Sequence, residues 1–277
     1  MLMQKINMHV HSTGSDGKLP PEQVIQEAIK DKIDFLCITD HYPCPNNLDP
    51  YSKDNYKEGH FENLKALSEK YKSKINVCVG AEFDWVEGYK EWYKKEISKK
   101  PCDLVIGSIH AIFTKNGISG FWDKESDRKK FIEEFGGTKK YVLEYFKQMR
   151  LLIKSELFDC VGHFDVIKLN NRNNSLFSEN EKWYIKEVKD CLDLLAKSKI
   201  VLEINARGLV KGHEQYPSLW ILKEAKKRNI PLTIGTDFHN YGENEPYLEK
   251  IYHLAREAGY KEAVRFEKRK KIVVSIV

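Results

Sequence analysis

The chain has 277 residues, of which 41% are hydrophobic and 31% are charged, and its formal net charge is +5. The apolar fraction suffices for a sizeable core. No apolar run approaches the ~20 residues needed to cross a bilayer, which excludes a membrane-spanning segment. The first residues also lack the apolar stretch of a secretory signal, so we predict a cytoplasmic protein.

Apolar runs of strand length alternate with amphipathic stretches of helix length along the whole chain. Most runs are continuously apolar, as expected for parallel strands covered on both faces. The strand candidates are Lys5–Val10, Phe35–Thr39, Asn76–Ala81, Asp103–Ile109, Asp159–Gly162, Ile200–Asn205 and Pro231–Gly235. The first helix candidate begins at Pro20-Pro21-Glu22, because proline is tolerated at a helix start, and it runs to about Lys32. The other helix candidates are Tyr56–Lys72, Gly88–Lys99, Thr138–Leu157, Glu179–Ser198, Ser218–Arg228 and Glu245–Ala258. About seven such repeats, without a linker or a composition shift, predict one domain over residues 1–277 built as a closed or nearly closed barrel.

Three features lie outside this alternation. The segment Ile112–Thr138 is long and glycine-rich, and loops of this length are often functional lids. The basic run Lys268-Arg269-Lys270-Lys271 lacks an aromatic pattern suited to nucleic acid, so it predicts a solvated turn before a C-terminal strand. The six cysteines form no Cys-x-x-Cys pair, and we therefore expect free thiols without a disulfide or a thiolate zinc site.

Histidines and carboxylates stand at or just past the C-terminal ends of six of the seven predicted strands. The first strand ends in His9-Val10-His11, whose two imidazoles project to the same side. The later strand ends carry, in chain order, Asp40-His41, Glu82, His110, His163 and Asp237-x-His239. Because these ends meet on one face of a parallel barrel, where active sites are built, we expect the side chains to converge.

The candidate ligands have a consistent chemical character. Imidazole and carboxylate without thiolate favour catalytic Zn²⁺, Mn²⁺ or Fe²⁺ over a structural zinc. With Asp16, which lies in a Ser15-Asp16-Gly17 turn, the set has nine members and exceeds the three protein ligands usual for one catalytic ion. It predicts two or three divalent ions, with Glu82 as a bridge. Of the other histidines, we interpret His60 and His253 as surface helix residues, whereas His213 fits a site or a surface loop.

Taken in order, the strand-end motifs resemble the PHP (polymerase and histidinol phosphatase) family over nearly the whole chain. These motifs are His9-x-His11, Thr39-Asp40-His41, Gly80-x-Glu82, Ser108-x-His110, Gly162-His163 and Thr236-Asp237-x-His239. The stretches Ala81-Glu82-Phe83-Asp84, Gly107-Ser108-Ile109-His110, Phe158 to Asp165 and Leu202-Glu203-Ile204-Asn205 are similar to the histidinol-phosphate phosphatase branch. The resemblance implies a single-domain, distorted (β/α)₇ TIM-like barrel that hydrolyses L-histidinol phosphate to L-histidinol and phosphate in histidine biosynthesis.

The resemblance also implies three ions with defined ligands. Carried over residue by residue, the ligands are His9, His11, Glu82 and Asp237 for the first ion, Glu82, His110 and His163 for the second, and Asp16, His41 and His239 for the third. Many family members have histidine where this chain has Asp16, and the histidinol-phosphatase branch often has aspartate there.

Phosphate-monoester hydrolysis is very slow without a catalyst, and enzymes accelerate it by up to ~10²¹-fold, so several effects must combine. We hypothesise attack by a hydroxide that bridges the first two ions, with the third ion on the ester side of the phosphate. The predicted catalytic residues are Glu82, Asp237, His239 and Arg207. Arg207, just past the sixth strand, is expected to grip phosphate as a fork, and Lys168 is a second phosphate-binding candidate ahead of Lys211 and Arg172. Asp40 and Asp165 either orient a ligand or protonate the leaving alkoxide.

Three other functions remain open from the residues alone. A PHP phosphoesterase acting on nucleotides or another phosphorylated metabolite needs the same ions. An amidohydrolase barrel also begins with His-x-His, but such sites usually bridge two metals with a strand-borne carboxylated lysine or carboxylate. The strand ends of this chain carry Thr39-Asp40-His41 and Gly80-x-Glu82 instead. A non-catalytic PHP-like module, as found beside polymerases, typically loses ligands that this chain retains. The expected partner is therefore a small phosphorylated metabolite, with no nucleic acid and no membrane, and the sequence leaves the oligomeric state open.

Overall fold

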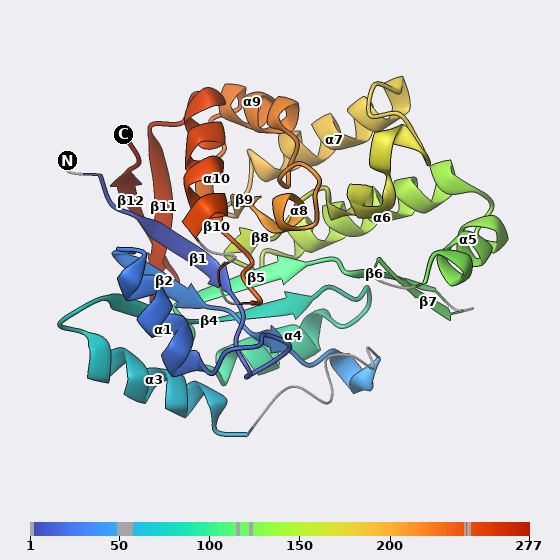
Figure 1. The fold of residues 1–277 in the computed structure, drawn as a ribbon. Coiled ribbons are helices and arrows are strands. Elements are labelled where there is room, and N and C mark those ends of the chain that lie inside the picture. The colour runs from blue at the N-terminus through green and yellow to red at the C-terminus, as the bar shows by residue number, and fades with distance from the viewer. Residues whose placement is uncertain (1–2, 49–57, 115–116, 122–123, 241, 243–244) are drawn as a thin grey trace.

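A parallel sheet forms the centre of the molecule (Figure 1). The computed structural model describes residues 3–48, 58–114, 117–121, 124–240, 242 and 245–277. The strands of the sheet, in spatial order, are β1 Ile6–Val10, β2 Phe35–Ile38, β4 Asn76–Asp84, β5 Leu104–Ser108, β8 Cys160–Val161, β9 Val201–Asn205 and β10 Leu232–Gly235. Each pairs in parallel with the next, and all seven predicted strands are present. The predicted TIM-like barrel architecture is therefore confirmed.

The first and last strands of this order meet at their C-terminal ends. The Asp237 N–H donates to the His9 carbonyl at 2.8 Å, and the His11 N–H donates to the Phe238 carbonyl at 2.9 Å. Val10 and Phe238 form a parallel bridge between these bonds. The barrel is thus nearly closed, and its closure places the residues that follow β10 directly against those that follow β1.

Strand β4 is longer than the predicted run Asn76–Ala81 and extends to Asp84. Its second half pairs with the two-residue strand β3 (His41–Tyr42), and His41 lies opposite Glu82. The structure thus places Glu82 inside a paired strand and not past its end. The ladder hydrogen bonds on both sides of this segment hold the Glu82 backbone fixed at the centre of the barrel.

Helices surround the sheet, with α1, α3 and α4 on one side and α6, α7, α9 and α10 on the other (Figure 1). The helices are α1 Pro21–Lys30, α3 His60–Tyr71, α4 Lys90–Ser98, α5 Glu125–Glu134, α6 Thr138–Ser155, α7 Lys182–Leu195, α8 Arg207–Val210, α9 Leu219–Lys227 and α10 Glu245–Glu257, with short 3₁₀ turns at Pro45–Asn47, Val166–Asn170 and Arg172–Asn174. Pro21 occupies the first turn of α1, as the sequence predicts. The expected start of the second helix at Tyr56 lies outside the described residues.

The prediction of one long loop over Ile112–Thr138 is wrong. Strands β6 (Ala111–Thr114) and β7 (Gly117–Gly120) form an antiparallel hairpin, and α5 follows. Figure 1 places this hairpin beyond the C-terminal ends of the central strands. The Phe121 N–H donates to the carbonyl of His110 at 3.0 Å, so the hairpin returns to the strand end from which it leaves. Of the glycines that suggested a loop, Gly117 and Gly120 are the first and last residues of β7, and Gly136 and Gly137 lie between α5 and α6.

The C-terminal hairpin covers the opposite end of the barrel. Strand β11 (Glu262–Glu267) pairs antiparallel with β12 (Lys270–Ser275). Lys268 and Arg269 adopt the left-handed conformation of a tight turn, so the predicted turn and C-terminal strand are confirmed. The Arg269 guanidinium pairs with Asp159 at 2.9 Å, which ties the turn to the start of β8.

All six cysteines are buried free thiols, and burial raises the pKa of Cys78 to about 12. Within the described ranges, no helix combines the length and the apolar character that crossing a membrane requires.

Candidate metal centre

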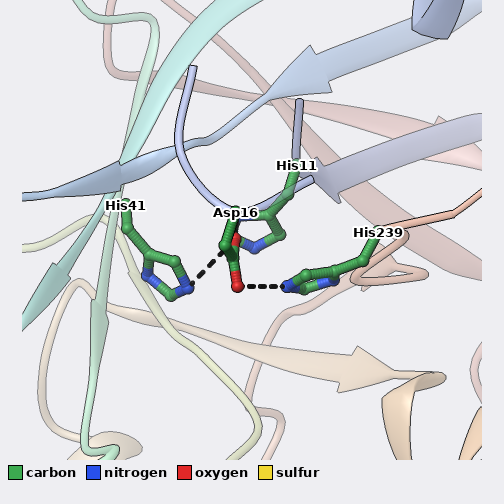
Figure 2. A group of neighbouring side chains, drawn as sticks. All are labelled: His11, Asp16, His41 and His239. Carbon is green, nitrogen blue, oxygen red and sulfur yellow. Dashed lines mark ion pairs between the residues drawn. The ribbon is translucent and has the colours of Figure 1, made fainter. Parts of the chain in front are cut away.

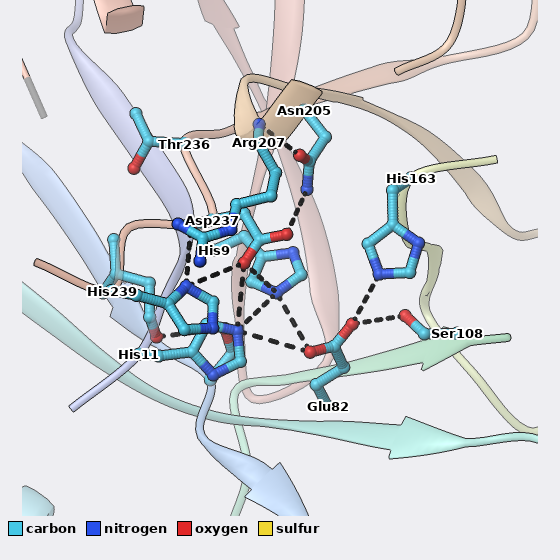
Figure 3. Close-up of polar contacts among 12 residues, drawn as sticks. His9, His11, Glu82, Ser108, His163, Asn205, Arg207, Thr236, Asp237 and His239 are labelled. Carbon is cyan, nitrogen blue, oxygen red and sulfur yellow. Dashed lines mark hydrogen bonds and ion pairs between the residues drawn. The ribbon is translucent and has the colours of Figure 1, made fainter. Parts of the chain in front are cut away.

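Two histidines at the end of β1 face a glutamate from β4 and an aspartate that follows β10 (Figure 3). His9 Nε2 lies 3.0 Å from His11 Nε2, and these atoms lie 3.2 and 3.3 Å from Glu82 Oε2. Asp237 Oδ1 lies 3.4 Å from His11 Nε2 and 4.0 Å from His9 Nε2. All four residues are buried. Their facing nitrogen and oxygen atoms form a first group suited to one divalent ion.

A second group uses the other oxygen of Glu82. His163 Nε2 lies 3.0 Å from Glu82 Oε1, and His110 Nε2 lies 3.4 Å from the same oxygen. The two imidazole nitrogens are 2.9 Å apart. The Ser108 hydroxyl donates to Glu82 Oε1 at 2.5 Å and fixes the orientation of the carboxylate. This group comes from the ends of β5 and β8, which are neighbours in the sheet.

A third group forms around Asp16 at the mouth of the barrel (Figure 2). Asp16 Oδ2 lies 3.2 Å from His239 Nε2, and Asp16 Oδ1 lies 3.8 Å from His41 Nε2 and 3.7 Å from His11 Nδ1. Asp16 is the most exposed member, with 41% of its side chain accessible. The structure thus brings all nine predicted ligands into one continuous cluster, including Asp16 from its turn.

The donor atoms of the cluster fit divalent cations. In each of the three groups, at least three nitrogen or oxygen atoms from different residues lie within 4.8 Å of one another. Glu82 Oε2 is buried and has no hydrogen-bond partner among the described protein atoms, although imidazole nitrogens surround it. An orphaned carboxylate oxygen of this kind is costly unless a cation binds it. Imidazole and carboxylate donors without thiolate suit Zn²⁺, Mn²⁺ and Fe²⁺.

The electrostatics of the cluster also favour positive charge. Burial alone would raise the pKa values of Glu82 and Asp237, but the neighbouring histidines hold both well below their usual values. Burial alone would lower the pKa of His110, but Asp84 and Glu82 raise it to about 9. The cluster therefore retains protons on imidazole at neutral pH when no other cation is bound. A metal ion that binds there replaces these protons.

The family model described as the PHP domain matches residues 7–207. The chain belongs to the PHP domain family. The matched residues contain seven of the nine predicted ligands, and the other two, Asp237 and His239, lie beside them in space. The family resemblance that the strand-end motifs predicted is confirmed.

Proteins named histidinol-phosphatase or histidinol phosphate phosphatase are similar to this PHP domain protein in sequence and in fold. A Deinococcus radiodurans protein named "Probable histidinol-phosphatase" is 27% identical over 84% of this chain and 83% of its own length. The histidinol-phosphatase of Bacillus subtilis is 25% identical over 90% of this chain and its whole length. A Lactococcus lactis histidinol phosphate phosphatase, solved with zinc, L-histidinol and phosphate, has a TM-score of 0.74 at 22% identity and covers 97% of this chain and 99% of its own. That structural likeness supports the same fold.

Two buried carboxylates of this PHP domain, Asp84 and Glu203, contact the outer nitrogens of ligand candidates; the sequence analysis named them only as members of the branch motifs and gave them no role. Glu203 Oε1 lies 2.7 Å from His9 Nδ1, and Asp84 Oδ1 contacts His110 Nδ1. A carboxylate on Nδ1 fixes the tautomer that leaves Nε2 free for a metal. Asp84 stands two residues after Glu82 on the same strand, and this spacing was the signal that could have revealed it.

Asp40 positions the turn that carries Asp16. Its carboxylate accepts hydrogen bonds from the Ser12 N–H and hydroxyl, both at 2.6 Å, and from the Ser15 hydroxyl at 2.7 Å. Burial alone would raise the pKa of Asp40, but contact with His60 lowers it to about 2. Of the two roles left open for Asp40, these contacts fit positioning.

The interpretation of His60 as a surface residue is wrong. Its side chain is buried at the start of α3, and its Nε2 lies 2.8 Å from Asp40 Oδ2. The turn residue Gly14 permits this approach, because a Cβ there would lie 2.1 Å from His60 Cε1. A helical position alone did not reveal that this face of α3 packs against the ligand-bearing turn. His253 on α10 is exposed, as predicted.

Replacing His60 with alanine should lower the free energy of unfolding by about 1–3 kcal/mol, because the buried Asp40 carboxylate loses its imidazole partner. Urea denaturation of the metal-free protein measures this change. The matched control is His253→Ala on the exposed face of α10, which should stay within about 0.5 kcal/mol of wild type. Equal effects of the two substitutions would contradict the assigned contact.

The phosphate-binding candidates differ in their surroundings. Figure 3 shows the Arg207 side chain reaching from the start of α8 towards Asp237 and His239. Lys168 instead is buried, and it pairs with Asp165 at 3.0 Å and with Glu214 at 3.3 Å. These carboxylates neutralise the Lys168 ammonium, so its contacts give no support to a phosphate-binding role.

The remaining candidates lie outside the three groups. Asp165 accepts hydrogen bonds from the backbone and hydroxyl of Ser218 at 3.0 and 3.1 Å, and not from His163, so its contacts do not fit the ligand-orienting role. His213 accepts a hydrogen bond from the Arg172 guanidinium at 3.1 Å in the loop after α8. That contact occupies both His213 and Arg172 at the surface.

Proposed function

We propose that this PHP domain protein is a metal-dependent phosphatase that hydrolyses L-histidinol phosphate to L-histidinol and phosphate. The observation that carries the proposal is the convergence of six imidazoles and two further carboxylates around Glu82 at the C-terminal ends of the barrel strands. Relatives of nearly the same length that are named histidinol-phosphatases support this substrate. A nucleotide phosphatase of the same family is the alternative.

The proposed centre holds three ions. The ligands would be His9, His11, Glu82 and Asp237 for the first ion, Glu82, His110 and His163 for the second, and Asp16, His41 and His239 for the third. When bound, such ions lower the pKa of water towards ~7 and stabilise the attacking and leaving oxygens of an in-line displacement. Three divalent ions against three carboxylates leave an excess of positive charge, which suits a phosphate dianion.

Glu82 and Arg207 contribute to this proposed site in different ways. Glu82 connects two of the groups because each of its oxygens faces a different set of histidines, with His9, His11 and His41 around Oε2 and His110 and His163 around Oε1. Arg207 extends from the start of α8 on the Asp237 side, and its guanidinium offers a fork of donors for phosphate oxygens.

Replacing Arg207 with alanine should lower kcat/KM by about 10²-fold, because one charged donor aimed at the transition-state phosphate is lost. Steady-state phosphate release with L-histidinol phosphate measures the effect. Arg228→Ala at the end of α9, which removes a surface pair with Glu224, is the matched control and should leave kcat/KM unchanged. A value within about threefold of wild type for Arg207→Ala would show that Arg207 does not bind the phosphate.

The substrate is tested with a panel of phosphate esters. The purified chain, loaded with Zn²⁺ or Mn²⁺, is assayed with L-histidinol phosphate, nucleoside monophosphates and p-nitrophenyl phosphate. We expect kcat/KM for L-histidinol phosphate to exceed that for nucleotides by at least about 100-fold, the discrimination that a site with matched polar contacts achieves. A preference for nucleotides would replace the proposed substrate and keep the phosphatase chemistry.

A further inference from the structure

Two buried polar side chains at the end of β9 lie behind the proposed metal ligands. Glu203 and Asn205 are two residues apart, so both point into the barrel. Both are fully buried, and neither belongs to the three ligand groups. The neighbouring strand leaves room for them at Gly235, where a Cβ would lie 2.3 Å from Glu203 Oε1 and 2.5 Å from the Cβ of His9.

Glu203 joins ligands of two different groups through one carboxylate. Its Oε1 lies 2.7 Å from Nδ1 of His9, and its Oε2 accepts the backbone N–H of His163 at 2.8 Å. An ionised carboxylate only accepts hydrogen bonds, so His9 must donate from Nδ1, which leaves Nε2 as the nitrogen available to the first group. His163 adopts a positive φ of 23°, and the bond from Glu203 holds its backbone in that strained conformation.

Asn205 extends this connection to the other side of the centre. Its amide NH₂ donates to Glu203 Oε2 at 3.0 Å. The same NH₂ donates to Asp237 Oδ2 at 3.2 Å, a contact that Figure 3 shows. Its Oδ1 accepts the backbone N–H of Arg207 at 2.8 Å, at the first residue of α8. Since the NH₂ faces two carboxylates and the oxygen faces an N–H donor, only one orientation of the amide satisfies these three contacts.

We propose that Glu203 and Asn205 act as one positioning unit, which holds the His9–Asp237 ion site and the His163 ion site in a fixed relation to each other. The inference rests on the proposed function, because it assumes that these residues bind ions. It predicts that the first two ions are coupled through β9, whereas the third ion, at Asp16, His41 and His239, is independent of it.

Glu203→Gln tests this coupling with almost no change in shape. Glutamine presents one oxygen and one NH₂, so its NH₂ must face either the His9 Nδ1–H or the His163 N–H, and one contact becomes donor against donor. Substitutions behind metal ligands typically weaken metal binding by about 10- to 100-fold. We expect the affinities of the first and second ions to fall together by such a factor and that of the third ion to stay at the wild-type value.

Metal content provides the measurement. The apo protein is titrated with Co²⁺ and followed by its d–d absorption, and Zn²⁺ retained after gel filtration is counted by elemental analysis. We expect Glu203→Gln to retain about a third of the wild-type zinc. Asn205→Ala leaves the Glu203 carboxylate in place but removes the link to Asp237. It should therefore lower the affinity for the same two ions by a smaller factor. It also keeps the test decisive if Glu203→Gln does not fold.

Asp103→Asn is the matched control. Like Glu203, Asp103 is contacted through both carboxylate oxygens, here by the backbone N–H groups of Val79 at 3.0 Å and Lys268 at 2.8 Å, but at the opposite end of the barrel. It should lower the melting temperature and leave the cobalt spectrum and the zinc content unchanged. This comparison separates positioning of the ions from general support of the fold.

The outcomes distinguish this inference from the proposed function. Weakening of the first ion alone, or of none, in both β9 variants would overturn the coupling. A wild-type chain that takes up no ion would overturn the coupling and the metal-dependent function together. A wild-type chain that binds its ions and loses two of them in Glu203→Gln, but does not hydrolyse L-histidinol phosphate, would support the coupling and refute the proposed substrate.

Discussion

Glu82→Gln should remove both the bound metal and the phosphatase activity. Each oxygen of this carboxylate faces a different histidine group, with His9 and His11 on Oε2 and His163 on Oε1. A glutamine has one acceptor oxygen and no charge, so it serves at most one of the two groups. We expect kcat/KM to fall by more than about 10³-fold, which exceeds the loss of a single electrostatic contact of about 10²–10³.

The measurement combines zinc content with phosphate release. Both quantities should fall in parallel in Glu82→Gln, while the folded structure persists by circular dichroism because the substitution conserves volume. The matched control is Glu87→Gln. Glu87 is exposed and lies three residues past the end of β4, so this variant should keep metal and activity. Retention of two tightly bound ions by Glu82→Gln would refute the bridging role.

Metal removal gives the second large effect. A chelator should abolish hydrolysis, and added Zn²⁺ or Mn²⁺ should restore it, because the bound ions would supply both the activated water and the positive charge that stabilises the phosphate in the transition state. The cluster also predicts how binding depends on pH. Burial alone would lower the pKa of His11, but Asp237 and Glu82 raise it to about 10, and the pKa of His110 is raised to about 9.

The sign of the pH effect follows from these values. In the metal-free protein, His11 and His110 carry protons at pH 7, and both must lose them to bind a metal. Metal affinity should therefore rise with pH between pH 6 and 8, by about tenfold per pH unit for each proton released. Calorimetric titrations in buffers of different ionisation enthalpy count the protons. Heats that do not depend on the buffer would contradict proton release.

The sequence by itself determined the architecture and the members of the cluster. Most of the seven predicted strand runs are continuously apolar, which favours parallel strands covered on both faces, and all seven are paired in parallel in the central sheet. The polar residues at the ends of these runs had to meet, because parallel strands bring their C-terminal ends to one face. For this reason His9, Glu82 and Asp237 were predictable as neighbours from their places along the chain.

Only the tertiary structure decided what supports these ligands. Glu203 and His9 are 194 positions apart in the sequence, and their 2.7 Å contact depends on barrel closure and on the space left at Gly235. His60 appeared to be a surface residue because its helical pattern does not reveal that Asp40 lies opposite it. Hydrogen bonds between distant residues follow from side-chain geometry in the closed barrel, which strand-end spacing does not encode. The members of the cluster were therefore predictable from the sequence, whereas the contact of Glu203 with His9 was not.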